Sequence, residues 1–150
     1  MQAIFVAGRV FFILMFAYSG AQKLLNIADT ASLISSKIVL PLALTGAGSQ
    51  IEAMIGMSIP QLLAILLGAA ELAAAILIAF NVGVRPMAAL LVLFTAAGIY
   101  YFHDFWNMIG DERASSVTLA VRDLSVIGAL LILLALGSWH PGDDGRAGEI

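Results

Sequence analysis

The sequence contains no cysteine, and this absence excludes disulfide bonds, thiolate catalysis and thiol-ligated metal sites. It also excludes the four-helix membrane proteins that pass electrons through their own cysteines. If the chain takes part in redox chemistry, the electrons must therefore come from a bound ligand or from a partner protein.

Charged residues are scarce as well, at 11% of the chain against about 25% in ordinary soluble domains. Hydrophobic residues account for 61%. This composition excludes a water-soluble monomer and predicts an all-α, polytopic membrane protein in contact with a lipid bilayer. The net charge of -3 is not gathered on one face, and nucleic acid is not an expected ligand.

Four apolar stretches have about the 20 residues that a bilayer requires. They cover residues 3–25, 60–80, 86–105 and 117–136, with a short tail at 137–150. Pro60 opens the second stretch, and Ser115 or Ser116 is expected to cap the fourth. The first stretch also has features of a cleaved signal peptide, but we expect it to be retained. The pattern predicts an antiparallel bundle of four transmembrane helices in a single membrane domain over 1–150.

The connection at 26–59 is too polar and too broken to span. Its apolar residues still recur at helical spacing, which predicts two short interfacial helices between spans one and two. Asp29 or Thr30 is expected to cap the first, and a turn is expected at 46–49 before the second. This segment either forms a lid over the bundle or docks a partner protein.

Glu71 lies at the centre of the second span. A charge at the middle of a bilayer costs roughly 2.5–3.5 kcal/mol, so this carboxylate must face the bundle interior and either form an ion pair or carry a proton. Arg9 and Arg122 are the candidates for structural ion pairs with it. Small residues around Glu71, and Gly20 in the first span, predict close helix packing.

Polar residues gather where spans one, three and four would meet in an antiparallel bundle. We call this predicted set the polar rim: Gln22, Lys23, His103, Asp104, Trp106, Asn107, Arg122 and Asp123. The rim includes the stretch YYFHDFWN, in which the tyrosines and Trp106 are typical of an interfacial aromatic belt.

Two cations and a titratable imidazole at a partly dry mouth suit a small oxyanion or the carbonyl oxygens of a quinone. The other rim residues would help to bind it, while His103, Asp104 or Glu71 moves protons as a catalytic group. No metal is expected, because a single histidine among scattered acids lacks a ligand-spacing pattern. The alternative is structural: Lys23 reaches toward the interface, and Arg122 pairs with Asp123, Asp104 or Glu71.

The charges do not fix the orientation. In the predicted bundle, each side of the membrane carries three basic residues, so the excess of positive charge that marks the cytoplasmic side is absent. The three on one side are Arg9, Arg85 and Arg146, and the three on the other are Lys23, Lys37 and Arg113.

These residues together resemble the DoxX family. RVFFILMFAYSGAQK from Arg9 to Lys23 resembles the first-helix pattern of that family, and Glu71 in GAAELAAAILI matches its second-helix glutamate. HDFWNM followed by a helix with a basic-acidic pair resembles one bacterial branch. The 26–59 connection is longer than is usual, and Arg122-Asp123 stands where Lys-Asn is common in the family.

The resemblance implies a four-helix bundle in the cytoplasmic membrane of a prokaryote, with both termini in the cytoplasm and the polar rim outside. Some members of the family are subunits of thiosulfate:quinone oxidoreductases, and others are linked to membrane complexes that handle oxidative or thiol stress. Quinone is therefore the cofactor to consider, and a redox subunit or a second copy of the chain is the partner to consider.

Three functions are open at this point. The first is a membrane subunit of a quinone-linked oxidoreductase, with Lys23, His103 and Arg122 at the ligand. The second is a non-catalytic scaffold that assembles a partner through the 26–59 segment. The third is a pathway for protons or a small solute along Arg9, Glu71 and the polar rim, for which the alanine-rich bundle leaves little room.

Overall fold

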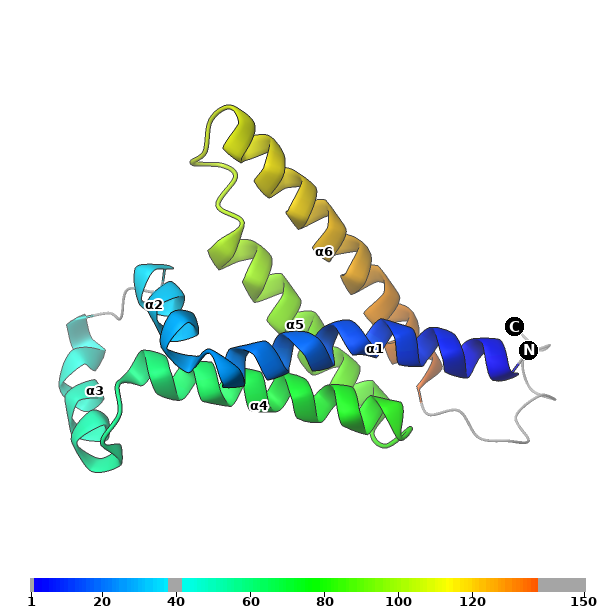
Figure 1. Cartoon of the computed structure of the whole chain (residues 1–150), viewed down its shortest axis with the longest axis horizontal. Coiled ribbons are helices and arrows are strands. Elements are labelled where there is room, and N and C mark those ends of the chain that lie inside the picture. The colour runs from blue at the N-terminus through cyan, green and yellow to red at the C-terminus, as the bar shows by residue number, and fades with distance from the viewer. Residues whose placement is uncertain (1, 38–41, 138–150) are drawn as a thin grey trace. The chain divides into compact units, whose positions relative to one another are not determined.

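The computed structural model describes residues 2–37 and 42–137, and within these ranges all regular structure is helical. The helices are α1 (Gln2–Leu25), α2 (Ile27–Lys37), α3 (Leu42–Ile55), α4 (Ile59–Ala79), α5 (Val84–Phe102) and α6 (Asp111–Leu136) (Figure 1). The predicted all-α class is confirmed. The chain divides into two compact units, Met1–Ala75 and Ile76–Ile150, which are described separately.

Three of the described helices, α4, α5 and α6, are each long and apolar enough to cross a membrane. A fourth span is present if α1 and α2 form one broken span, because Val6–Leu25 and Ile27–Lys37 pass the same test as a pair. These two segments meet at an angle of 95°. Multiple transmembrane helices are thus supported, while the antiparallel four-helix arrangement and the single-domain organisation stay predictions.

In the first unit, α1 crosses α4 at Gly20, where the two backbones come very close. A Cβ atom added at Gly20 would lie 2.8 Å from the carbonyl oxygen of Gly68 and 2.8 Å from the backbone nitrogen of Leu72. Helices in a bilayer associate through such close contacts between small residues. Gly20 is therefore the close-approach point that the sequence predicted.

Side chains on either side of the turn at 56–58 cap the start of α4. Gln61 Oε1 accepts a hydrogen bond from the backbone N–H of Ser58 at 3.0 Å, and Glu52 Oε1 of α3 accepts one from Ile59 at 2.8 Å. Pro60, in the first turn, has no N–H to satisfy. These bonds satisfy N–H groups that the helix leaves unpaired, and the second bond also ties α3 to α4.

The second unit is built on an antiparallel pair, α5 and α6, which Figure 1 shows joined by the loop before Asp111. At one end, the Arg85 guanidinium at the start of α5 donates to the carbonyl oxygen of Ala135 at 3.4 Å. A cation here complements the negative end of the α6 dipole. Gly137 follows with a φ of 69°, and a Cβ at this position would lie 2.6 Å from Arg85 Nε.

At the other end of this pair, four aromatic rings gather. Tyr100 contacts Tyr101 and Trp106, with ring centroids 5.0 and 5.9 Å away, and Phe105 lies 4.6 Å from Trp106. Tyr100 is 64% exposed and Trp106 is 50% exposed. Amphipathic rings grouped at one end of an apolar helix have the arrangement of an interfacial belt.

Two predicted helix boundaries are wrong. Helix α6 begins at Asp111, before the predicted start of the fourth span at 117, so Ser115 and Ser116 lie inside α6 and do not cap it. Gly110, with a φ of 68°, takes the cap position, and the carboxylates of Asp111 and Glu112 stabilise the first turn through the helix dipole. The apolar run alone did not reveal this polar first turn.

The second wrong boundary lies in the 26–59 connection, although its two predicted helices are present as α2 and α3. Helix α2 begins at Ile27, before the predicted caps Asp29 and Thr30. Helix α3 continues through 46–49, where we predicted a turn. A Cβ at Gly48 would lie 2.8 Å from Ile59 Cδ1, so this glycine serves close packing between the start of α4 and a continuous helix.

The crossing at Gly20 gives the first testable prediction. Gly20→Ala should lower the free energy of unfolding in detergent by about 1–3 kcal/mol, because the added methyl group forces two backbones apart. Gly8→Ala in the same helix is the matched control, since nothing lies within 4 Å of its Cβ position, and it should be neutral or stabilising. Equal effects of the two substitutions would contradict the crossing.

Candidate functional site

The first polar cluster lies in the unit formed by α1 to α4, beside the Gly20 crossing. Lys23 Nζ of α1 lies 2.5 Å from Glu71 Oε2 of α4, and it also donates to Ser19 Oγ at 2.6 Å. The Glu71 side chain is 9% exposed and the Lys23 side chain is 32% exposed. Glu71 is therefore the buried member of the pair, and Lys23 connects it to the surface.

The position of this pair follows from the helix period. Gly20 and Lys23 are separated by three residues, as are Gly68 and Glu71, so each charged residue lies one turn from the glycine on its own helix. A close backbone crossing thus brings the ammonium and the carboxylate together. The sequence contains a signal for this pair, namely a glycine three residues before the charged residue in both spans.

The structure also shows where the three basic residues of the predicted site lie. Lys23 was predicted to bind the ligand, yet its ammonium is engaged with Glu71 and Ser19. Arg9 is also buried, with 8% of its surface exposed. Arg122 pairs with its neighbour Asp123, as the structural alternative foresaw. The roles predicted for Lys23, Arg9 and Arg122 in ligand binding or catalysis stay predictions.

The second polar cluster joins α5 to α6. His103 follows the last residue of α5, and its Nε2 lies 3.0 Å from Asp123 Oδ2. The side chains of His103 and Asp123 are 16% and 19% exposed, respectively. Arg122 donates to the other carboxylate oxygen of Asp123, Oδ1, at 3.2 and 3.3 Å. The guanidinium is 64% exposed. Asp123 thus holds the imidazole with one oxygen and a cation with the other.

This hydrogen bond limits what the imidazole can do. In the tautomer in which Nε2 donates to the carboxylate, Nδ1 keeps a lone pair that can accept a proton. His103 and Asp123 together therefore have the composition of a general base with its orienting acid.

The neighbouring rim residues make local contacts. Asn107 donates to Asp104 Oδ1 at 2.7 Å and closes the turn after α5. Trp106 stacks within the aromatic cluster, and Gln22 accepts a hydrogen bond from Asn26 at 2.8 Å near the end of α1. The structure gives these four residues local structural contacts, and their predicted binding or catalytic roles stay predictions.

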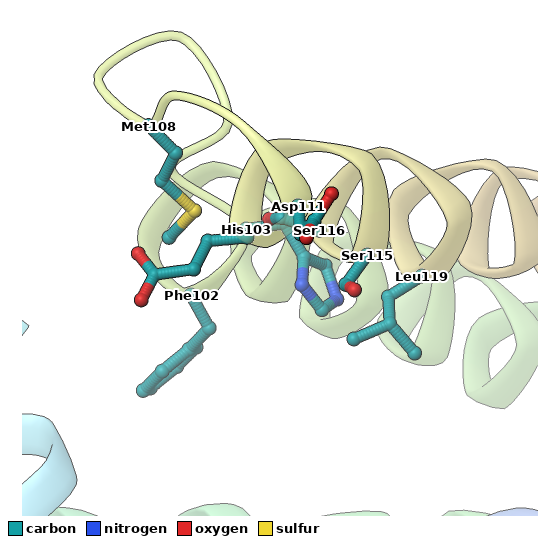
Figure 2. Close-up of a pocket in the computed structure, with 8 residues that line it drawn as sticks. Phe102, His103, Met108, Asp111, Ser115, Ser116 and Leu119 are labelled. Atoms are coloured by element: carbon teal, nitrogen blue, oxygen red, sulfur yellow. The ribbon is translucent and has the colours of Figure 1, made fainter.

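A pocket lies beside His103 (Figure 2), and we call it the hairpin pocket. Its volume is about 470 Å³, within the range of about 300–1,000 Å³ that is usual for small-molecule sites. Its lining combines apolar, hydroxyl, imidazole and acidic side chains: Phe102, His103, Met108, Asp111, Glu112, Ser115, Ser116 and Leu119. All of these residues belong to the second unit.

Ser116 is the unusual member of this lining. Its side chain is buried, with only 6% of the residue exposed, and its hydroxyl has no hydrogen-bond partner within the part of the chain that the structure describes. A buried hydroxyl without a partner costs about 1–3 kcal/mol. From the sequence, Ser116 was predicted only as a possible helix cap, and its place in the pocket was not predicted.

Charge decides which ligands suit the hairpin pocket. Asp111 and Glu112 place two carboxylates in its wall, and the Arg122 guanidinium is bound to Asp123. Like charges repel, so these two carboxylates disfavour an oxyanion in the pocket. A flat, neutral molecule with polar oxygens fits this lining better. Within residues 2–37 and 42–137, no group of three or more His, Cys, Asp or Glu side chains is placed to hold a metal ion.

The residues of the predicted polar rim are divided between the two units of the chain. Lys23 and Gln22 lie in the first unit, whereas His103, Asp104, Arg122 and Asp123 lie in the second. Convergence is realised within the second unit, where His103 and Asp123 meet although they are 20 residues apart. That the rim residues of the first unit lie next to those of the second unit stays a prediction.

The Lys23–Glu71 pair gives the second testable prediction. Lys23→Met should destabilise the protein by roughly 2–4 kcal/mol, because it leaves a buried carboxylate without its partner. The double variant Lys23→Met/Glu71→Leu should recover most of that loss in the same unfolding assay in detergent. Lys37→Met, on the exposed end of α2, is the control and should be near neutral. Additive losses in the double variant would show that the two residues do not act as a pair.

Comparison with known proteins agrees with the resemblance noted in the sequence. The chain matches the sequence profile described as DoxX over residues 4–104, which include most of α1, all of α2 to α5 and His103. It is 33% identical over 88 residues to the inner membrane protein YphA of Escherichia coli strain K12. This match covers 59% of the chain and 63% of the length of that relative.

No solved structure matches the chain. The family match covers about two thirds of the chain, and it contains both Arg9 and Glu71, which carried the resemblance in the first two spans. The order of apolar helices also agrees with a membrane protein. This chain belongs to the DoxX family.

Proposed function

We propose that this protein is an inner-membrane subunit of a quinone-linked oxidoreductase and that the hairpin pocket binds the head group of the quinone. The location rests on the relative in Escherichia coli, whose name places it in the inner membrane, and on the apolar helices of this chain. Both termini lie in the cytoplasm in this proposal.

One observation carries the proposal, namely the His103 imidazole that Asp123 holds in the wall of the pocket. A quinone takes up and releases protons when its redox state changes, so its site needs a titratable group next to its oxygens. His103 meets this need, and Phe102, Met108 and Leu119 supply apolar walls for the ring. Asp123 is then a positioning residue, because it acts through the imidazole.

The same geometry favours a quinone over a small oxyanion, the other ligand that the sequence left open. Lys23, one of the two cations proposed for an anion, is engaged with Glu71. Arg122, the other, is paired with Asp123, and two carboxylates line the pocket. A neutral quinone head group carries no charge, so these carboxylates do not repel it as they would an oxyanion.

The chain must work with a partner in this proposal. It has no cysteine, so the electrons that reduce or oxidise the quinone have to pass to or from another subunit. Glu71 is assigned to the structural ion pair with Lys23 rather than to proton transfer, because its carboxylate is bound by an ammonium and lies in the other unit of the chain.

The third testable prediction concerns bound quinone. Protein that is extracted gently from its own membrane should carry quinone at a fixed stoichiometry in native mass spectrometry, together with a redox subunit. His103→Leu should reduce the bound quinone at least about tenfold, since it removes the polar group that faces the head group. Asp123→Asn should give a smaller reduction.

Thr95→Val is the matched control, because Thr95 bonds only to the Leu91 carbonyl of its own helix at 2.8 Å, away from the pocket. This variant should keep its quinone. If native mass spectrometry finds only lipid on a homo-oligomer of the wild-type chain, the oxidoreductase proposal is wrong and the scaffold function replaces it. Unchanged quinone in His103→Leu would reject the hairpin pocket as the site.

A further inference from the structure

The hydroxyl of Ser116 differs from three other helical hydroxyls in its unit. Thr95, Thr118 and Ser125 each donate to the carbonyl four residues earlier, at 2.8, 2.9 and 3.0 Å. This local bond is the usual way in which a helix satisfies a serine or threonine. Ser116 does not make it, although its hydroxyl is less accessible than theirs.

The place of this hydroxyl is as important as its missing partner. Ser116 lines the hairpin pocket together with His103, as Figure 2 shows. The residue is more than nine-tenths buried, so bulk water does not satisfy the hydroxyl either. A polar group that is buried in the wall of a pocket and left without a partner is one that a ligand can satisfy.

We propose that the Ser116 hydroxyl binds an oxygen of the quinone head group and thereby selects oxygen-bearing ligands over hydrocarbons of the same shape. This inference rests on the proposed function and adds a specificity-determining residue to it. A hydroxyl is both a donor and an acceptor, so Ser116 can donate to a quinone carbonyl and accept from a quinol hydroxyl. The same side chain therefore serves both redox forms of the ligand.

Ser116 and His103 then divide the recognition between them. The imidazole, oriented by Asp123, handles the proton, whereas the hydroxyl is neutral and contributes only a hydrogen bond. The apolar lining contacts the ring in a way that does not depend on its oxygens. Removal of the hydroxyl should therefore reduce affinity for the oxygens and leave affinity for the ring unchanged.

The test compares two ligands and two variants in nanodiscs, with the full chain. The ligands are 1,4-naphthoquinone and naphthalene, which share a ring system and differ in the two oxygens, and binding is measured by equilibrium dialysis. Ser116→Ala should weaken binding of 1,4-naphthoquinone about five- to tenfold and change binding of naphthalene less than about twofold. Ser125→Ala is the matched control, because Ser125 is not among the lining residues and donates to the Val121 carbonyl of its own helix at 3.0 Å. This variant should leave both affinities unchanged.

A measurement of stability separates this role from a structural one. Ser116→Ala removes a buried group that lacks a partner, so the melting temperature without ligand should stay the same or rise. A substantial fall in that temperature, with equal losses of affinity for both ligands, would overturn the inference, because the hydroxyl would then support the fold.

The remaining outcomes distinguish the two proposals. If wild-type protein binds 1,4-naphthoquinone, His103→Leu abolishes the binding and Ser116→Ala does not weaken it, the inference about Ser116 is wrong and the proposed function stands. If wild-type protein binds 1,4-naphthoquinone no more tightly than naphthalene, the quinone site itself is rejected, and the inference with it.

Discussion

The cost of a polar or charged group in an apolar surrounding is the constraint on which this structure depends. It explains why Lys23 and Glu71 meet at the closest helix crossing of their unit and why Asp123 is bonded on both oxygens. It also explains the cap at the start of α4, where Glu52 and Gln61 satisfy backbone N–H groups. Each polar contact offsets a desolvation cost that the hydrocarbon would otherwise impose.

Small residues make these polar contacts possible. Gly20 lets α1 approach Gly68 and Leu72 so closely that the Lys23 ammonium reaches a carboxylate on another helix. At the far end of the second unit, Gly137 leaves room for the Arg85 guanidinium against the end of α6. These polar contacts therefore depend on the glycines. A side chain at Gly20 would occupy the space of the crossing helix, and one at Gly137 would occupy the space of the Arg85 guanidinium.

Much of the fold could be predicted from the sequence, because long apolar runs and the scarcity of charge are direct consequences of a bilayer. The spans at 60–80 and 86–105 agree closely with α4 and α5. The start of α6 was missed, since its first turn is polar and hydropathy does not register a helix that extends beyond the membrane. The pairing of Lys23 with Glu71 was missed as well, because it depends on a crossing between helices that no single helix reveals.

Whether a buried polar group has a partner also distinguishes the proposed ligand site from the structural contacts. Lys23 and Glu71 satisfy one another, and a satisfied buried pair needs no ligand to explain it. The hairpin pocket is different, because it contains an imidazole that is bonded through one nitrogen and a buried hydroxyl that has no partner among the described residues. A chain under this constraint tolerates an unsatisfied polar group where a ligand supplies the missing bond. For that reason we propose a ligand site at His103 and Ser116 rather than at the ion pair in α1 and α4.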